Sequence, residues 1–227
     1  MRAGPLGILG GSFDPVHNGH LGLARDARAL LGLEAVRWVP SGAPGHREAP
    51  RAAALHRLAM LRLALAGEPG FSLDDADALA AQPTYTVNTL ARLRKELGPA
   101  QPLVFLMGTD QLLGLDRWRE WRTLFELAHF GVARRPGYDV SASALPAAVA
   151  AELARRQSGA AGLAQSPAGR IALFDNAPRD VSSSAVRRAL GAGTRPDDAL
   201  PAGVLGYIES HGLYLDRNSQ PSEARLR

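Results

Sequence analysis

Short apolar runs alternate along the chain with longer stretches in which apolar residues recur at helical spacing. The short runs predict buried strands, and the longer stretches predict amphipathic helices. Strands are expected at residues 6–9, 35–39, 71–73, 103–107, 129–133 and 171–174. Helices are expected at residues 21–31, 51–66, 86–97, 118–127, 146–156, 182–190 and 201–210. This regular alternation favours an α/β fold built on a parallel sheet.

The run at residues 103–107 is almost continuously apolar, which is typical of a strand covered by helices on both faces. The chain is therefore predicted to form a Rossmann-like, doubly wound parallel sheet that binds ligands at the carboxyl ends of its strands. A single domain is expected over residues 1–215, with a surface excursion at 141–166 that is biased toward Ala, Ser and Gly. The polar residues 216–227 are expected to form a flexible tail.

Two finer predictions concern the helices. In the helix at 51–66, one side is expected to carry Leu55, Leu58, Leu61 and Leu65, and the other side Arg57 and Arg62. Asn18 and Thr86 are expected at the N-terminal caps of their helices, because their side chains can accept hydrogen bonds from free backbone N–H groups.

Composition narrows the class of protein. The chain has 227 residues, no cysteine and no long uncharged apolar segment, so disulfides, a signal peptide and a membrane span are not expected. These features fit a cytoplasmic protein. The net charge of +4 comes from scattered arginines, and aromatic residues make up only 6% of the chain. Nucleic-acid binders more often cluster basic and aromatic residues, so the charge suits anionic small molecules at least as well.

The loop after the first predicted strand has the residues of an anion site. Gly10 and Gly11 lack Cβ, so the backbone is expected to bend with positive φ and to bring its N–H groups close to a phosphate. His17 and His20 are three apart at the start of a helix, where they share one face beside free N–H groups and the positive end of the dipole. A His-x-x-His pair can also bind a metal, but no third ligand stands at matching spacing and no metal site is expected.

A second group of polar residues begins the helix at 182–190. Hydroxyls such as that of Ser183 can cap a helix start and its N–H groups can hold phosphate, while Arg187, one turn further, can add a bidentate contact. A serine-rich cap followed by a solvated arginine is a common alternative reading of the same residues.

Taken whole, residues 10–20 resemble the (G)GxFDPxHxGH signature of the HxGH nucleotidyltransferases, which are relatives of the class I aminoacyl-tRNA synthetases. Residues 181–187 resemble the ISSTxIR motif of that family, with Ser184 where threonine is usual. Several independent motifs in the right order make this resemblance specific.

The middle of the chain resembles one branch, the bacterial nicotinate-nucleotide adenylyltransferases. Residues 40–47 are similar to their PxGxPPHK segment, with Gly45 in place of proline and Arg47 in place of lysine. The remaining matches are residues 83–90 (sYTxdTL, with Asn88 for aspartate), 108–112 (GxDxL), 118–121 (tryptophan-rich), 134–137 and 204–214. The resemblance covers roughly residues 6–214 and leaves out only the biased excursion.

The resemblance implies transfer of AMP from ATP to nicotinate mononucleotide, giving nicotinate adenine dinucleotide and pyrophosphate in NAD biosynthesis. His17, His20 and Arg187 are the implied catalytic residues. The implied ATP-binding residues are Gly10, Gly11, Ser12, Phe13, His17, His20, Gly108, Asp110, Ser183 and Arg187. The implied residues for nicotinate mononucleotide are Ser41, Arg47, Tyr85, Thr86, Asp110 and Trp118.

Mg²⁺ is expected to arrive on the ATP phosphates rather than in a protein cage, and no tightly bound organic cofactor is expected. A homo-oligomer is compatible with the sequence, whereas nucleic-acid and membrane partners are not expected. Trp121 and Tyr214 are expected to pack rather than to touch ligands. His46 is left without a role.

Three rivals stay open. Phosphopantetheine adenylyltransferases and cytidylyltransferases share the first motif but lack the segments at Tyr85, Thr86 and Trp118. The acceptor can be nicotinamide mononucleotide, the amide, instead of the acid. A basic tRNA-binding module is suggested by the sequence pI of about 10.1 and by the likeness to synthetases, although no basic-aromatic surface supports it.

Overall fold

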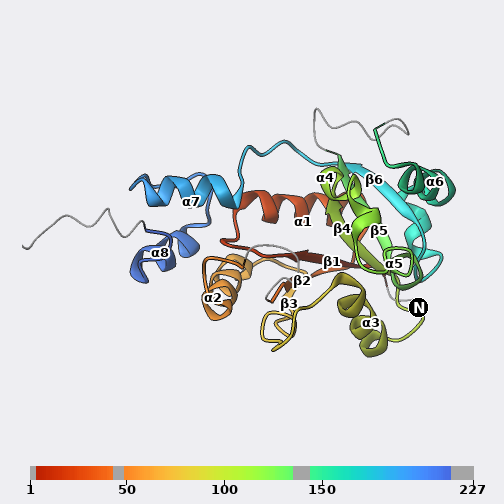
Figure 1. Ribbon diagram of the computed structural model, residues 1–227, viewed down its shortest axis with the longest axis horizontal. Coiled ribbons are helices and arrows are strands. Elements are labelled where there is room, and N and C mark those ends of the chain that lie inside the picture. The colour runs from red at the N-terminus through yellow and green to blue at the C-terminus, as the bar shows by residue number, and fades with distance from the viewer. Residues whose placement is uncertain (1–3, 43–48, 135–143, 216–227) are drawn as a thin grey trace, which may run out of the picture.

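A computed structural model describes residues 4–42, 49–134 and 144–215 of the chain (Figure 1). Its centre is a six-stranded sheet in the order β3-β2-β1-β4-β5-β6, and every neighbouring pair of strands is parallel. The strands are β1 (Leu6–Gly11), β2 (Ala35–Pro40), β3 (Phe71–Leu73), β4 (Leu103–Gly108), β5 (His129–Arg134) and β6 (Ile171–Asp175). Each lies where the apolar runs predict it, and the doubly wound α/β prediction is confirmed.

Helices cover both faces of the sheet. They are α1 (Asn18–Leu30), α2 (Ala54–Leu65), α3 (Thr86–Leu97), α4 (Thr109–Leu112), α5 (Leu124–Leu127), α6 (Ala147–Arg156), α7 (Ser183–Gly191) and α8 (Ala202–Ser210), with 3₁₀ turns η1 (Leu115–Arg117) and η2 (Ala160–Ala164). Leu9 of β1 joins a core with α1, α2, α7 and α8, whereas Ile8 joins a core with α3, α5 and α6. Alternate residues of one strand thus bury on opposite faces, as the pleat requires.

The chain reverses its direction of winding between β1 and β4, which are neighbours in space although β2 and β3 lie between them in sequence. Ligands of open α/β sheets bind at such a switch point, outside the carboxyl ends of the strands. Figure 1 shows α7 and α8 at that end of β1, reached by a long connection that leaves β6 and passes over α1.

The prediction for α2 is confirmed for Leu58 and Leu61, which are buried, and for the exposed Arg62, but it is wrong at two positions. Leu55 is 70% exposed, while Arg57 is only 2% exposed and lies among the buried residues of the helix. The reason is a polar contact that the spacing of apolar residues does not predict: Arg57 Nη1 donates a hydrogen bond of 2.7 Å to the backbone carbonyl of Ser12. A solvated arginine was expected at this position, and a buried one ties α2 to the loop after β1.

Two cap predictions are also wrong. His17, rather than Asn18, is the N-cap of α1, and Tyr85, rather than Thr86, is the N-cap of α3. Asn18 is the first helical residue, and its side-chain amide donates to the backbone carbonyl of Asp198 at 2.9 Å. The amide of Asn18 therefore joins α1 to the segment before α8.

The helix expected at 118–127 is not formed as one element. Residues 118–123 are turns after η1, and Glu120 has a φ of 50°, which a helix does not accommodate. Only α5 follows. Trp121 is 8% exposed and its ring lies edge-on to Phe125 with centroids 6.2 Å apart, so its predicted packing role is confirmed.

The described part of the 141–166 segment contributes to both cores. Leu145, Val149 and Leu153 bury in the core beneath α6, and Leu163 of η2 buries in the other. The predicted tail at 216–227 lies outside the described residues. Within the described ranges, no helix has both the length and the apolar character needed to cross a bilayer.

Candidate active site

The two predicted histidines meet at the start of α1. His17 is the N-cap and His20 the third residue of the helix, and their rings stack with centroids 3.7 Å apart and an angle of 25°. The backbone N–H of His17 donates to Nδ1 of His20 at 3.2 Å. Two imidazoles thus lie side by side at the positive end of a 13-residue helix, where an anion is stabilised.

The loop before them is built differently from the prediction for the glycines. Gly10 and Gly11 are the last residues of β1 and pair with Val39 and Pro40 of β2, and neither has a positive φ. Strand pairing up to Gly11 leaves no room for a bend there. The left-handed residue is Phe13, with a φ of 47°.

Phe13 is buried, and its ring contacts one of the two histidines. Its ring meets that of His20 edge-on at 5.0 Å and lies 5.2 Å from the ring of Trp38. A Cβ on Gly11 would lie 3.1 Å from this ring, so the small residue allows the loop to fold closely over it. The orientation of His20 therefore depends on an aromatic contact within the predicted ATP-binding loop.

Asp14 of this loop is 3% exposed, and its carboxylate accepts several hydrogen bonds. Its Oδ2 accepts from the backbone N–H of Arg51 at 2.8 Å, and its Oδ1 accepts from that of Ala52 at 3.0 Å. The Tyr214 hydroxyl also donates to Oδ1, at 2.7 Å. One carboxylate thus joins the loop after β1, the residues before α2 and the segment after α8.

Helix α7 docks on the same loop. Ser182 is its N-cap, with a side chain that accepts from the Ala185 N–H at 3.2 Å. Ser183 Oγ donates to the carbonyl of Pro15 at 2.9 Å, and Arg187 Nη1 donates to the carbonyl of Asp14 at 2.7 Å. The start of α7 therefore lies against the loop that carries the histidines, through bonds that span 168 and 173 residues of sequence.

Small residues on α1 permit this docking. A Cβ on Gly19 would lie 2.7 Å from Val181 Cγ1, and one on Gly22 would lie 2.1 Å from the guanidinium of Arg179. Arg179 in turn donates to Asp26 of α1 at 2.8 Å. The connection from β6 to α7 therefore lies directly on the helix that carries the histidines.

The remaining predicted ATP contacts lie at the neighbouring strand ends. Gly108 ends β4, and its N–H donates to Gln111 Oε1 at 3.1 Å. Asp110, in the next turn, is exposed, as an acceptor for ribose hydroxyls needs to be. Ser41 follows β2, and its N–H donates to the Gly11 carbonyl at 2.8 Å.

The predicted nicotinate contacts approach from α3 and the turns after η1. Tyr85 and Thr86 lie at the start of α3, and the guanidinium of Arg119 sits over the Tyr85 ring, 4.9 Å from its centroid. Trp118 is half-buried and meets Phe105 of β4 edge-on at 5.9 Å. Arg47 and His46 lie outside the described residues.

The contact between Trp118 and Phe105 brings Trp118 near the end of β1. A Cβ on Gly10 would be 3.5 Å from the Phe105 ring, so a single ring separates Trp118 from the end of β1. Trp118, predicted to bind nicotinate mononucleotide, and the predicted phosphate contacts therefore lie at the same edge of the sheet.

Arg57 and Tyr214 are residues of this site that the sequence did not indicate. Burial lowers the pKa of Arg57, but attraction to Asp14 acts in the opposite direction, and an arginine stays charged. Burial, together with the hydrogen bond to Asp14, raises the pKa of the Tyr214 phenol well above its usual value. Helical periodicity carries no signal for either role, since both depend on contacts with distant parts of the chain.

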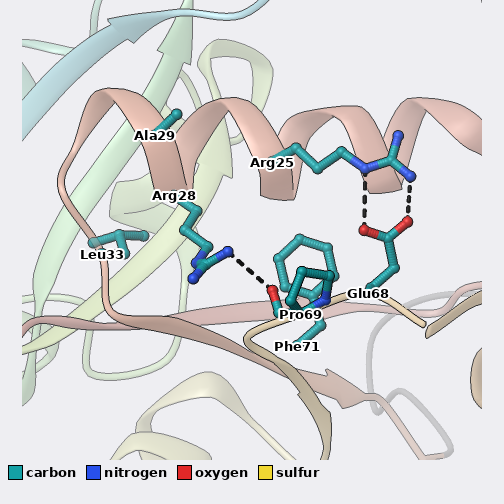
Figure 2. Close-up of a pocket in the computed structure, with 7 residues that line it drawn as sticks. All are labelled: Arg25, Arg28, Ala29, Leu33, Glu68, Pro69 and Phe71. Carbon is teal, nitrogen blue, oxygen red and sulfur yellow. Dashed lines mark hydrogen bonds and ion pairs between the residues drawn. The ribbon is translucent and has the colours of Figure 1, made fainter. Parts of the chain in front are cut away.

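A shallow cavity of about 480 Å³ lies at the opposite edge of the sheet. Figure 2 shows its lining: Arg25 pairs with Glu68, and Arg28 donates to the carbonyl of Pro69 at 2.9 Å. Leu33 and Phe71, which also line it, stand at the amino ends of β2 and β3. Because both guanidinium groups already have partners and the histidines are at the other edge, this cavity is no part of the candidate site.

No cluster of three or more His, Asp or Glu side chains that could hold a metal occurs among residues 4–42, 49–134 and 144–215. The carboxylate of Asp14 is the most enclosed acidic group of the site, and both of its oxygens accept hydrogen bonds from the protein.

Comparisons with known proteins agree with this arrangement. The sequence model of the cytidylyltransferase-like family matches residues 8–189. A probable nicotinate-nucleotide adenylyltransferase of Dechloromonas aromatica is 48% identical over 216 residues, which is 95% of this chain and 99% of that protein. Another, of Laribacter hongkongensis, is 50% identical over 218 residues, 96% of each chain.

A solved structure shares the fold. The nicotinic acid mononucleotide adenylyltransferase of Plasmodium falciparum, in complex with NaAD, superposes with a TM-score of 0.70 at 19% identity. The match covers 93% of this chain and 97% of that one.

Proposed function

The chain belongs to the cytidylyltransferase-like family, among its nicotinate-nucleotide adenylyltransferases, and we propose that the loop after β1 and the start of α7 together carry its reaction. Such an enzyme transfers AMP from ATP to nicotinate mononucleotide and releases pyrophosphate, a step of NAD biosynthesis. The single observation that carries the assignment of residues is the docking of α7 on the loop, through Ser183 and Arg187.

In this proposal the 5′-phosphate of nicotinate mononucleotide attacks the α-phosphorus of ATP in line. The new P–O bond forms as the bond to the β-phosphate oxygen breaks, and pyrophosphate leaves with the electron pair. The protein contributes positioning and charge neutralisation rather than a covalent intermediate.

His17 and His20 would donate hydrogen bonds to the ATP phosphates, with His20 nearest to the developing charge. Their stacking, and the Phe13 ring against His20, support this role because both limit the motion of the imidazoles. Ser183 and Arg187 would hold the leaving pyrophosphate. The backbone of residues 10–13, Gly108 and Asp110 would hold the rest of ATP.

For the acceptor, we propose the acid rather than the amide. Ser41, Arg47, Tyr85, Thr86, Asp110 and Trp118 would bind it, with the pyridine ring on Trp118. The observation that favours the acid is Arg119, whose guanidinium lies over the Tyr85 ring and also pairs with the exposed Glu120 at 3.4 Å. A cation there would attract a carboxylate and would gain little from a neutral carboxamide.

Mg²⁺ would arrive with ATP and would neutralise charge on its phosphates, with no residue of this chain proposed to hold it. We propose a cytoplasmic enzyme of small-molecule substrates, without nucleic-acid or membrane partners. The absence of cysteine supports this compartment.

The experiment is pyrophosphate release with ATP and Mg²⁺, comparing nicotinate mononucleotide with nicotinamide mononucleotide. A strong preference for the acid is expected. His20→Ala is expected to lower kcat by roughly a hundredfold while changing KM for ATP only about twofold, because the contact strengthens in the transition state. Equal losses in both constants, with intact folding, would remove His20 from the transition state, and no release with either acceptor would refute the proposed function.

A further inference from the structure

The turns between β3 and α3 hold a buried carboxylate, that of Asp77, which the proposed reaction does not use. Asp77 is 7% exposed, and its partner Thr89 on α3 is 8% exposed. The Thr89 hydroxyl donates to Asp77 Oδ2, and Arg92 Nη2 donates to Asp77 Oδ1 at 3.2 Å. Thr89 and Arg92 are three residues apart on one face of the helix, so both oxygens of Asp77 bind the same face of α3.

These bonds reach the beginning of α3, where two of the predicted acceptor contacts lie. Tyr85 is the N-cap of α3, and Thr86 is its first residue. The backbone N–H of Thr89 donates to the Tyr85 carbonyl at 3.0 Å, and the Thr89 hydroxyl lies 3.3 Å from the same oxygen. A carboxylate that holds Thr89 therefore also restrains the turn that carries Tyr85 and Thr86.

The backbone of Asp77 meets a second predicted acceptor segment, the loop after β2. A Cβ on Gly42, which follows Ser41, would lie only 2.4 Å from the carbonyl oxygen of Asp77. A real Cβ does not come that close, and a backbone oxygen cannot swing aside as the end of a flexible side chain can. Glycine at position 42 therefore lets the loop after β2 lie directly on the backbone of Asp77.

Asp77 is itself held in place from the sheet. The backbone N–H of Asp74 donates to the Trp38 carbonyl of β2 at 2.9 Å. The carboxylate of Asp74 accepts from both terminal nitrogens of Arg92, at 2.9 and 3.1 Å, and the same guanidinium also binds Asp77. The position of Asp77 is therefore linked to β2 through Asp74 as well as to α3.

We propose that Asp77 is a positioning residue for the acceptor: it sets the start of α3 against the loop after β2, the two segments that carry Tyr85, Thr86 and Ser41. This inference rests on the acceptor contacts given in the proposed function. Groups that bind one substrate from two segments must be held within a fraction of an ångström of their places, which residues behind them have to ensure. The histidines and α7 lie on other segments, so loss of the Asp77 contacts is expected to weaken binding of the acceptor and to spare that of ATP.

The test measures KM for each substrate by pyrophosphate release. Thr89→Val keeps the shape of the side chain and removes the hydroxyl that binds Asp77, whereas Thr89→Ser keeps the hydroxyl. We expect Thr89→Val to raise KM for nicotinate mononucleotide about fivefold with KM for ATP within about twofold, and Thr89→Ser to leave both within about twofold. KM does not depend on the folded fraction of the enzyme, so a destabilised variant still reports on positioning.

Two more variants separate positioning from a general loosening of α3. Gly42→Ala disturbs the other side of Asp77 through its carbonyl and should raise KM for nicotinate mononucleotide at least about threefold. The control Arg94→Met removes hydrogen bonds at the opposite end of α3, among them one to the Pro167 carbonyl at 3.0 Å. It should lower the urea midpoint of unfolding and leave both KM values within about twofold.

The outcomes distinguish this inference from the proposed function. If the wild type turns over nicotinate mononucleotide, the positioning role is overturned when Thr89→Val leaves KM for the acceptor unchanged or raises both KM values equally. It is also overturned when Thr89→Ser or Arg94→Met raises KM for the acceptor as much as Thr89→Val does. In these cases the proposed function stands. If the wild type releases no pyrophosphate with nicotinate mononucleotide, the proposed function fails and this inference falls with it.

Discussion

Replacing Arg57 by methionine tests whether a buried arginine, rather than an apolar face alone, fastens α2 to the loop after β1. Methionine keeps much of the volume and the flexibility of the side chain in a site where Arg57 is 2% exposed. What disappears is the charged donor to the Ser12 carbonyl at 2.7 Å and the positive charge near Asp14.

The magnitude follows from these contacts. A hydrogen bond from a charged donor contributes about 1.5–3 kcal/mol, and the Ser12 carbonyl left without this donor adds a penalty of about 1 kcal/mol. Relief from burying a guanidinium, whose desolvation lowers the pKa of Arg57, offsets part of the loss. The net expectation is a free energy of unfolding lower by about 2 kcal/mol, or a Tm lower by about 4–8 °C for a chain of this size.

The assay is urea unfolding followed by circular dichroism, with Arg62→Met as the matched control. Arg62 lies on the same helix with a side chain that is 60% exposed, and its pair with Asp75 at 3.2 Å is solvated. The control is expected to change stability by less than about 0.5 kcal/mol. Equal effects of the two substitutions, or a stabilised Arg57→Met, would refute the reasoning, because the burial of Arg57 would then contribute nothing.

Two further predictions concern specificity and pH. Arg119→Gln is expected to lower the preference for the acid over the amide by about tenfold in kcat/KM, since the proposed charged contact to the carboxylate is lost. An unchanged ratio of kcat/KM for the two acceptors, measured by pyrophosphate release, would remove Arg119 from acceptor recognition. His129 is fully buried, with Nε2 bonded to the Ser166 carbonyl at 2.7 Å and Nδ1 accepting from the Arg170 N–H at 3.0 Å. Burial lowers the pKa of its imidazole from the ordinary 6.5. Below about pH 6.5 the unfolded chain therefore binds a proton at this histidine that the folded chain does not bind, so the free energy of unfolding falls as the pH drops. His129→Gln should flatten that fall in urea midpoints measured from about pH 7 to about pH 5. Parallel curves for the two proteins would contradict this prediction.

The strands and most helices were predictable because their cause is local. A run such as residues 103–107 is apolar wherever it sits in the chain, and its burial between two helical layers follows from composition. Family motifs likewise placed the histidines and the start of α7, whose functional roles remain predictions. The docking of these two segments agrees with their expected use on a common ligand.

What the sequence could not supply are the contacts between distant segments. Arg57 is predicted on the outer side of its helix because the group it hydrogen-bonds, the Ser12 carbonyl, is 45 positions away. The bend assigned to Gly10 and Gly11 belongs to Phe13, since pairing of β1 with β2 continues to Gly11. Glycine is permissive in a strand as well as in a turn, so its presence alone does not locate the bend.

The bonds that complete the site span 168, 173 and 200 residues, from Ser183 to Pro15, Arg187 to Asp14 and Tyr214 to Asp14. During synthesis the histidine loop therefore leaves the ribosome long before the groups that hold it in place. A nascent chain that ends after β6 contains all six strands. Its Asp14 carboxylate lacks the hydrogen bond from Tyr214, and the loop after β1 lacks its contacts with α7. On the proposed function, such a chain lacks Ser183 and Arg187 and is expected to be inactive, and contacts this distant in sequence slow the final closure of the site.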